Sequence, residues 1–167
     1  QVWNELMAFI PEQWMRRPPN QEYKRIELNG QPGGRSWGLI EVKSAHDPES
    51  LQTAGLDFLW VTEAQELHNR AFEKMRPMVN SPHRLGRAVW EGIPALWRDH
   101  WFWRLCDYAA AGHDNYDYFH GTVYDNPLLT EEQYNEVQEE RNLLTDASWR
   151  RMYMAERSET AGFFKNI

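Results

Sequence analysis

The sequence of 167 residues predicts an α/β fold with a mostly parallel sheet and flanking helices. The first observation is an apolar run at residues 56–61, which follows Gly55 and contains one polar residue, Asp57. A strand that is apolar on both faces is typical of a buried parallel sheet, although a buried helix has the same pattern. The second observation is that strand-like and helix-like segments alternate along the chain. We therefore expect residues 56–61 to be the central strand.

The N-terminal part of the sequence predicts a helix and then a β-hairpin. Apolar residues recur at intervals of three and four over residues 2–10, and Pro11 ends the pattern. Residues 25–28 and 37–42 are strand-like. Residues 29–34 contain Asn-Gly and Pro-Gly pairs, which are typical of a turn between two strands.

The rest of the chain continues the alternation of helices and strands. After the hairpin we expect, in order, a turn or short helix at 47–51, a helix at 63–75, a strand at 87–91, a helix at 97–111, a strand at 117–123, a turn at 125–127, and helices at 131–144 and 147–156. Thr130 is expected to cap the helix at 131–144, because its hydroxyl can accept a hydrogen bond from the first turn.

The composition narrows the class of protein. The net charge is −7, from 18 basic and 25 acidic residues, and this argues against a nucleic-acid coat protein or a polybasic membrane binder. Cys106 is the only cysteine, so the sequence can form neither an internal disulfide nor a thiolate zinc site. No apolar run approaches the length of a membrane span. We expect a soluble, intracellular protein, and we interpret the start at Gln1, inside a helix-like pattern, as that of a piece of a longer chain.

Thr62-Glu63, directly after the apolar strand, is the sharpest chemical signal. Ligands of open α/β sheets bind beyond the carboxyl ends of the strands, so Glu63 is expected to face such a crevice. Nucleotide hydrolases place the Walker B pair there: the first residue helps to hold Mg²⁺, and the second, a Glu, orients the attacking water. Thr62 can hold a metal or its water but brings no charge. The alternative is that Glu63 is an ordinary carboxylate at a helix N-terminus.

Other motifs give weaker or negative signals. No lysine follows a glycine, so a Gly-Lys-Ser/Thr phosphate loop is absent, and residues 30–34 favour a turn instead. None of the six histidines has a spacing that would seat a metal. A tryptophan cluster can be interpreted as a base-stacking platform or, as its helical spacing favours, as core. It consists of Trp90, Trp97, Trp101 and Trp103. Cys106 is expected to be a small buried hydrophobe.

Taken in order, these segments resemble the ATPase domain of the large terminase subunit of tailed bacteriophages, the motor that packages DNA into the procapsid. The matching segments are residues 1–6 (a helix downstream of the phosphate loop), 26–30 and 38–45 (the hairpin), 47–65 (the approach to Walker B and its strand end), Gly92-Ile93-Pro94 (the coupling motif), 124–128 (an Asp-Asn-Pro turn) and 153–164 (the end of the ATPase domain).

The resemblance implies an incomplete RecA-like sheet of the ASCE class of P-loop NTPases. It implies that residues 1–167 lie downstream of the Walker A loop and end near the linker to a nuclease domain. It also implies Glu63 as the catalytic residue, Thr62 in the shell of Mg²⁺ and ATP, and Gly92, Ile93 and Pro94 as coupling residues. The implied partners are double-stranded DNA, the portal protein, the small terminase subunit and other copies in a ring, without a membrane. The implied location is the host cytoplasm, transiently at the procapsid portal.

The sequence departs from the family pattern in three ways. Thr62 replaces the Walker B aspartate. Residues 52–54 are Gln-Thr-Ala where many members carry an arginine that can reach a neighbouring γ-phosphate, and Arg35 is the nearest upstream arginine. The phosphate loop and the nuclease carboxylates are absent, which we interpret as the mark of a fragment or a truncated product. Without the backbone amides and the lysine of the loop, we expect no measurable hydrolysis by this chain alone. A second function therefore stays open, a catalytically degenerate α/β scaffold that acts through protein contacts, and Gly92-Ile93-Pro94 is equally compatible with an ordinary turn.

Overall fold

The structure is a computed structural model that describes residues 2–30, 37–51, 55–81, 84–97 and 99–157. The chain divides into two compact units, Gln1–Leu51 and Gln52–Ile167, which are described one at a time. None of the helices in the described ranges combines the length and the hydrophobicity that a membrane span requires.

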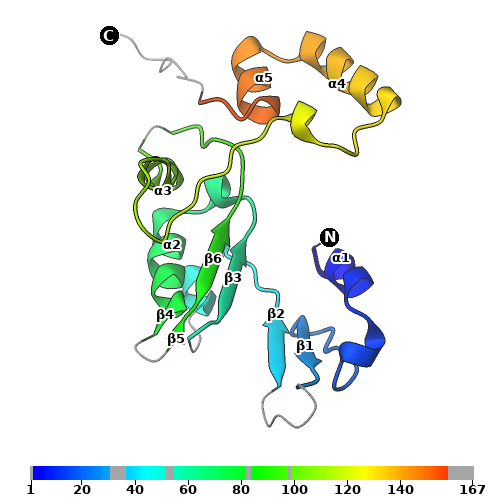
Figure 1. Cartoon of the computed structure of the whole chain (residues 1–167), viewed down its shortest axis with the longest axis vertical. Helices are drawn as coiled ribbons and strands as arrows, with labels where there is room; N and C mark the ends of the chain where they lie inside the picture. The colour runs from blue at the N-terminus through cyan, green and yellow to red at the C-terminus, as the bar shows by residue number, and fades with distance from the viewer. Residues whose placement is uncertain (1, 31–36, 52–54, 82–83, 98, 158–167) are drawn as a thin grey trace. The chain divides into compact units, whose positions relative to one another are not determined.

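Unit 1 contains the predicted helix and hairpin (Figure 1). Helix α1 spans Val2–Phe9, and strands β1 (Arg25–Leu28) and β2 (Gly38–Glu41) pair antiparallel. Two 3₁₀ turns, η1 (Glu12–Trp14) and η2 (Pro48–Leu51), lie outside the helix and strands. The helix and hairpin predictions are confirmed, whereas most of the turn predicted between the strands, residues 31–34, lies outside the described residues.

The core of unit 1 is small. Ile26 of β1 is fully buried and Trp3 of α1 is 6% exposed. The Trp3 indole donates a hydrogen bond to the Gln21 side chain at 2.7 Å, and the Lys24 ammonium lies 5.4 Å from the centre of the Trp3 ring. The partly polar Trp3 is therefore satisfied at both its indole N–H and its ring face.

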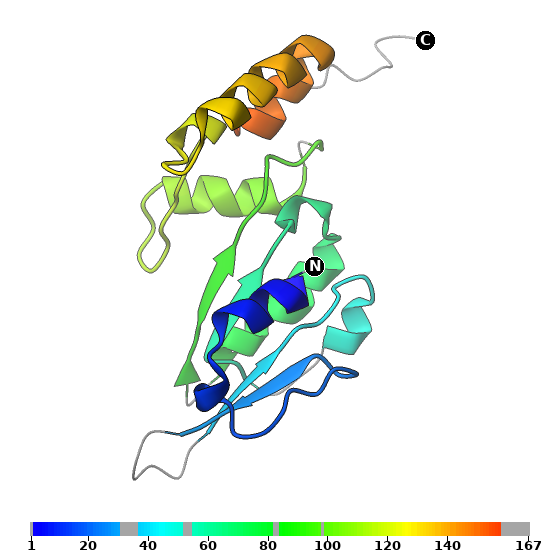
Figure 2. The same cartoon turned by 90° about the vertical axis from the view of Figure 1, so that its right-hand side faces the viewer.

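Unit 2 is built around a parallel strand pair. Strand β3 (Phe58–Val61) pairs with β6 (Arg87–Trp90), with Val61 opposite Trp90. Figures 1 and 2 together show helix α2 (Asn69–Met75) along one face of this pair and helix α3 (Trp101–Ala110) beyond the carboxyl ends of the strands. A 3₁₀ turn η4 (Arg76–Val79) and a short antiparallel ribbon of β4 (Asn80–Ser81) and β5 (Arg84–Leu85) complete the crossover.

An aromatic cluster fills the space between the strand pair and the helices. Phe72 of α2 stacks on Trp101 of α3 at a ring-centre distance of 4.4 Å, and Trp90 of β6 meets both rings edge-on at 5.3 and 5.5 Å. Trp101 is 3% exposed. The interpretation of the tryptophans as core is therefore confirmed for Trp101, but it is wrong for Trp97, which is 76% exposed before α3 begins.

The predicted central, doubly buried strand needs correction. Within the described residues the strands form three two-stranded sheets, and the parallel prediction is confirmed for β3 and β6 alone. Strand β3 has β6 as its one neighbour there. Phe58 and Trp60 are 55% and 62% exposed, because α2 and α3 pack against the face that carries Val61 and Trp90.

Two predicted helices begin later than expected. The helix predicted at 63–75 begins at Asn69, because Leu67 is extended and His68 caps the chain with a hydrogen bond from the Arg70 amide. The helix predicted at 97–111 begins at Trp101, because His100 is extended and its side chain accepts from the Phe102 amide. Histidine side chains thus set both starting points, a role that the sequence analysis did not assign.

The strand predicted at 117–123 is wrong. No partner strand is available among the described residues, and the Thr122 amide and hydroxyl bond to the Asp125 carboxylate at 2.6 and 2.8 Å, opening the 3₁₀ turn η5 (Val123–Asp125). Helix α4 (Glu131–Leu143) and helix α5 (Asp146–Tyr153) follow as predicted, to within a few residues at their ends.

Helices α4 and α5 form an antiparallel pair joined by a two-residue connection (Figure 2). No described residue of α4 is buried, whereas Trp149 of α5 is 4% exposed and stacks on Tyr153 at 4.5 Å. The Arg141 guanidinium lies 5.8 Å from the Trp149 ring centre. Trp149 is therefore the packing anchor of this pair.

Candidate functional site

The carboxyl end of β3 places Glu63 in an unusual backbone conformation. Glu63 has φ of 53° and ψ of 44°, the left-handed region, although it is not glycine. Such a conformation costs about 1–2 kcal/mol for an L-residue and concentrates at functional sites. The 3₁₀ turn η3 (Ala64–Glu66) follows directly, and α2 starts only at Asn69. Glu63 therefore stands at the N-terminus of the 3₁₀ turn η3 and not in the first turn of α2, so the alternative of an ordinary carboxylate at a helix N-terminus stays open.

Gln65 holds the side chain of Glu63. The Gln65 amide nitrogen Nε2 donates to Glu63 Oε2 at 2.5 Å, and Gln65 itself is 8% exposed. The other amide atom, Oε1, is buried and has no hydrogen-bond partner. Glu63 as a whole is exposed to solvent, and the Gln65 amide is the hydrogen-bond partner of its Oε2 atom.

The end of β6 is joined directly to this turn. The Glu91 amide donates to the Val61 carbonyl at 3.0 Å, and the Ala64 amide donates to the Glu91 carbonyl at 2.9 Å. Gly92 follows, and a Cβ atom built on it would lie 2.0 Å from Gln65 Oε1 and 3.1 Å from the Ala64 nitrogen. Gly92 is therefore a glycine because the backbone must approach the Gln65 side chain closely. The structure brings the Glu63 and Gly92 segments together, as the strand order predicts.

The loop after Gly92 is fastened to two helices. Ile93 and Pro94 are half-buried, and the Pro94 carbonyl accepts a hydrogen bond from Arg151 of α5 at 3.3 Å. The Ala95 carbonyl accepts from the Trp103 indole of α3 at 2.9 Å, and Ala95 is 1% exposed. The predicted coupling segment thus has one end on the Glu63 turn and the other on α3 and α5.

Thr62 and Glu63 do not make a metal site by themselves. Mg²⁺ takes octahedral oxygen ligands, through one or two carboxylates, waters and substrate phosphates. Thr62 is exposed and neutral, and Gln65 already occupies one oxygen of the Glu63 carboxylate. No cluster of three or more His, Cys, Asp or Glu side chains lies in the described parts of the chain. We therefore derive no chemical step through Mg²⁺.

His100 connects the segment after Glu63 with helix α3. Its Nε2 lies 3.0 Å from the Leu67 carbonyl, and its Nδ1 accepts from the Phe102 amide at 3.2 Å. These partners require the neutral ring with its proton on Nε2. Burial lowers the pKa of His100 below its ordinary value of 6.5, against the opposing effects of Leu67 and Glu66. His100 is a structural link between the Glu63 turn and α3.

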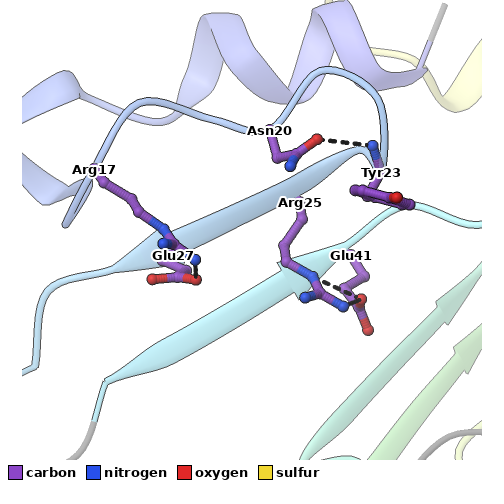
Figure 3. A network of polar contacts seen from close by, with 6 residues as sticks. All are labelled: Arg17, Asn20, Tyr23, Arg25, Glu27 and Glu41. Carbon is purple, nitrogen blue, oxygen red and sulfur yellow. Dashed lines mark hydrogen bonds and ion pairs between the residues drawn. The ribbon is translucent and has the colours of Figure 1, made fainter.

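Unit 1 holds a separate polar cluster, shown in Figure 3. Arg17 pairs with Glu27, which is 8% exposed, and Arg25 pairs with Glu41 at 2.5 Å. The Asn20 side chain accepts from the Tyr23 amide at 2.9 Å. A cavity of about 340 Å³ lies among Arg17, Pro18, Pro19, Asn20, Arg25 and Glu27. Both arginines pair with carboxylates of the hairpin strands, Arg17 with Glu27 of β1 and Arg25 with Glu41 of β2.

Comparison with known proteins adds two structural matches. No protein-family model and no curated protein sequence matches the chain. A mutant of the large terminase ATPase domain of Thermus phage P74-26 matches with a TM-score of 0.63 and 18% identity, over 87% of this chain and 65% of that one. A second structure of this ATPase domain matches with a TM-score of 0.62 and 18% identity, over 93% and 67%.

The chain has the fold of a terminase ATPase domain. It spans about two thirds of the length of the terminase domains that it matches. The likeness covers nearly the whole chain, as the resemblance found in the sequence predicts. Arg35 and residues 52–54, which the sequence analysis compared with an arginine that reaches a neighbouring γ-phosphate, lie outside the described residues.

One residue of the candidate site, Gln65, is not predicted from the sequence. Gln65 stands two positions after Glu63, within the quoted Thr62-Glu63-Ala64-Gln65 segment, but no role was assigned to it. The available signal was the side-chain amide of Gln65, a polar group next to the small apolar residue Ala64. Its contact with Gly92, 27 positions later in the chain, is a tertiary feature that local patterns do not contain.

Cys106 is not a nucleophile of this site. The thiol is half-buried in α3, and burial raises its pKa, so the thiolate is disfavoured. The prediction of a small buried residue is corrected to a half-buried one. Cys106 packs as a small apolar side chain without a chemical role.

Proposed function

We propose that this chain is part of the ATPase motor domain of a phage terminase large subunit, which couples ATP hydrolysis to translocation of viral DNA into the procapsid. The observation that carries the proposal is Glu63 in a left-handed conformation at the end of β3, joined by backbone hydrogen bonds to the Gly92 segment. The terminase ATPase fold supports it. The carboxyl ends of β3 and β6 are the edge at which ligands of such sheets bind.

Glu63 acts in this proposal as the residue that orients and polarises the water attacking the γ-phosphate. Glu63 is exposed and its carboxylate can accept a proton from water, while the Gln65 amide donates a hydrogen bond to its Oε2 atom. Thr62 stands next to it, where its hydroxyl can contact a water of the Mg²⁺ shell when Mg²⁺ and ATP are bound.

Gly92, Ile93 and Pro94 act as the coupling segment. A change at Glu63 reaches them through the Gln65 side chain and through the Ala64–Glu91 hydrogen bond, and Arg151 and Trp103 hold the other end of the loop. The proposed partners are double-stranded DNA, the portal protein, the small terminase subunit and further copies in a ring. The proposed location is the host cytoplasm and, during packaging, the procapsid portal.

A second candidate function is a catalytically degenerate scaffold that acts through protein contacts. Two observations favour it: Thr62 in place of the Walker B aspartate, and the lack of a Gly-Lys-Ser/Thr motif in this sequence. The strained Glu63 backbone opposes it, because a degenerate site has no use for a conformation that destabilises the fold.

Packaging by the complete protein tests the proposal. Gly92→Val is expected to retain nucleotide binding and to protect less DNA from nuclease inside procapsids for each ATP consumed, because a side chain at Gly92 pushes against Gln65. Gly121→Val is the matched control, since a Cβ at Gly121 meets no atom within 4 Å. Proportional loss of both quantities, or loss of neither, makes Gly92 a turn residue. A wild-type protein that neither hydrolyses ATP nor protects DNA supports the scaffold.

A further inference from the structure

We propose that Gln65 is a positioning residue: the Gly92 loop sets the orientation of the Glu63 carboxylate through the Gln65 side-chain amide. The inference rests on the proposed catalytic role of Glu63. It adds a residue, Gln65, for which neither the terminase likeness nor the strand-end pattern specifies a role.

The amide orientation of Gln65 is fixed by Glu63. With Nε2 toward Glu63 Oε2, a donor faces a carboxylate at 2.5 Å. The opposite orientation would place Oε1, an acceptor, against the carboxylate, and neither oxygen could donate. The hydrogen bond to a charged acceptor is therefore the contact that decides how Gln65 sits.

Gln65 cannot move independently of its surroundings. It is 8% exposed, and its neighbour Ala64 is fully buried and bonded through its amide to the Glu91 carbonyl. The Gly92 backbone lies so close that a single added Cβ would fall 2.0 Å from Oε1 and 3.1 Å from the Gln65 Cδ. A shift of the loop at Gly92 must therefore displace the amide that holds Glu63.

The unpaired oxygen of Gln65 is the point at which a second arrangement of the Gly92 loop would gain a hydrogen bond. Gln65 Oε1 is buried without a donor in the described structure, and an unsatisfied buried acceptor costs free energy. An arrangement of the Gly92 loop that offers a backbone N–H to Oε1 would recover that cost. Gain or loss of this donor is a discrete event at the Glu63 site, as a switch between two loop arrangements requires.

The structural half of the proposal is tested on the 167-residue chain. Gly92→Ala is expected to lower the unfolding midpoint in urea and to shift the side-chain ¹⁵N–¹H signals of Gln65 in an NMR spectrum. The double variant Gly92→Ala with Gln65→Ala is expected to recover part of the lost stability, because the new methyl group gains room. Gly121→Ala, in open space, is the control and should leave both readouts unchanged. Additive losses and an unshifted Gln65 signal would overturn the contact.

The functional half is tested by kinetics of the complete protein. Gln65→Met keeps the side-chain length and removes the hydrogen bond, so kcat for ATP is expected to fall about tenfold or more with little change in KM. In a Glu63→Gln background the same change is expected to have almost no further effect, because Gln65 acts through Glu63. Multiplicative losses in the double variant, or an unaltered kcat in Gln65→Met, would show that Gln65 does not position Glu63.

The outcomes separate this inference from the function on which it rests. If Glu63→Gln lowers kcat but Gln65→Met does not, the inference fails and the proposed function stands. If Glu63→Gln leaves hydrolysis unchanged, or the wild-type protein has none, the proposed function fails and the role of Gln65 falls with it. The NMR and unfolding results then still decide whether the Gly92–Gln65 contact exists.

Discussion

At the scale of single residues, the candidate site is distinguished by the strained backbone of Glu63. Four non-glycine residues of the described chain have positive φ angles, namely Lys24, Glu63, Asn115 and Ala155. Glu63 is the one of these that also follows a parallel strand and shares a partly buried hydrogen bond with Gln65. The left-handed region favours glycine, so a glutamate there lowers the stability of the fold.

Glycine at position 63 should therefore stabilise the fold relative to alanine. Glu63→Gly and Glu63→Ala both remove the carboxylate, but only alanine retains the left-handed strain. We expect Glu63→Gly to be more stable than Glu63→Ala by about 1 kcal/mol, a difference of roughly 2–4 °C in Tm for a chain of this size. Thermal unfolding of the two variants measures it. Equal Tm values would mean that the backbone relaxes away from the left-handed region.

At the scale of elements, histidine side chains cap the N-termini of helices α2 and α3. His100 accepts from the Phe102 amide through Nδ1, and this hydrogen bond exists only while the ring is neutral. Because burial lowers the pKa of His100 in the folded state, the unfolded chain binds a proton between the folded pKa and 6.5 that the folded chain does not. Stability is thus present above pH 6.5 and is lost as the pH falls through that window.

His100→Asn should reduce this pH dependence. Asparagine is a good N-cap and does not titrate, so helix α3 keeps its starting point. Urea unfolding at pH 7 and at pH 5 is expected to show a smaller loss of stability in His100→Asn than in the wild-type chain. An identical loss in both proteins would assign the acid sensitivity to other groups.

Helix α4 combines a capping box with the absence of buried residues among those described. It has no buried described residue, and the Thr130 hydroxyl accepts from the Gln133 amide at 3.2 Å while the Gln133 side chain accepts from the Thr130 amide at 3.0 Å. Thr130→Ala is expected to destabilise α4 by about 1 kcal/mol, and Thr130→Ser to be close to neutral. Hydrogen exchange of the α4 amides measures this, and unaltered protection in Thr130→Ala would contradict it.

Local chemistry explains which elements the sequence predicts. The strand character of β3, the pairing of β1 with β2 and the Thr130 cap each follow from a few neighbouring residues, and all three are confirmed. The strand at 117–123 fails because a strand needs a partner, and alternation alone does not supply one. The exposed face of β3 is likewise missed, because hydrophobicity does not tell which helices will cover it.

Only part of the site is predictable from the sequence, because the rest depends on contacts between segments that are distant along the chain. Glu63 follows from its place after an apolar strand, and its approach to Gly92 follows from the pairing of β3 with β6. The left-handed φ angle of Glu63 and the contact of Gln65 with Gly92 depend on how the turn packs in the folded chain. The type of a single residue does not predict either of them. Tertiary packing overrides helix propensity there, since residues 63–68 are helix-like in sequence but include an extended Leu67.

At the scale of the whole molecule, a terminase ATPase fold places one carboxylate, Glu63, at the end of a strand. The structural matches at 18% identity show the fold, and the motor function is a proposal that depends on Glu63. Each proposed step uses groups of this chain: Glu63 orients water, Gln65 positions Glu63, and the Gly92 loop links the site to α3 and α5. The proposal therefore depends on the chemistry of the Glu63 side chain.

The most direct measurement is steady-state ATP hydrolysis by the complete protein and its Glu63→Gln variant, with nucleotide affinity measured in parallel. Orienting water is a transition-state effect, so Glu63→Gln is expected to lower kcat about 100-fold or more while the affinity for ATP stays nearly constant. Glu66→Gln, an exposed carboxylate three residues further on, is the matched control and should hydrolyse ATP at close to the wild-type rate. Hydrolysis by Glu63→Gln at the wild-type rate would contradict the account.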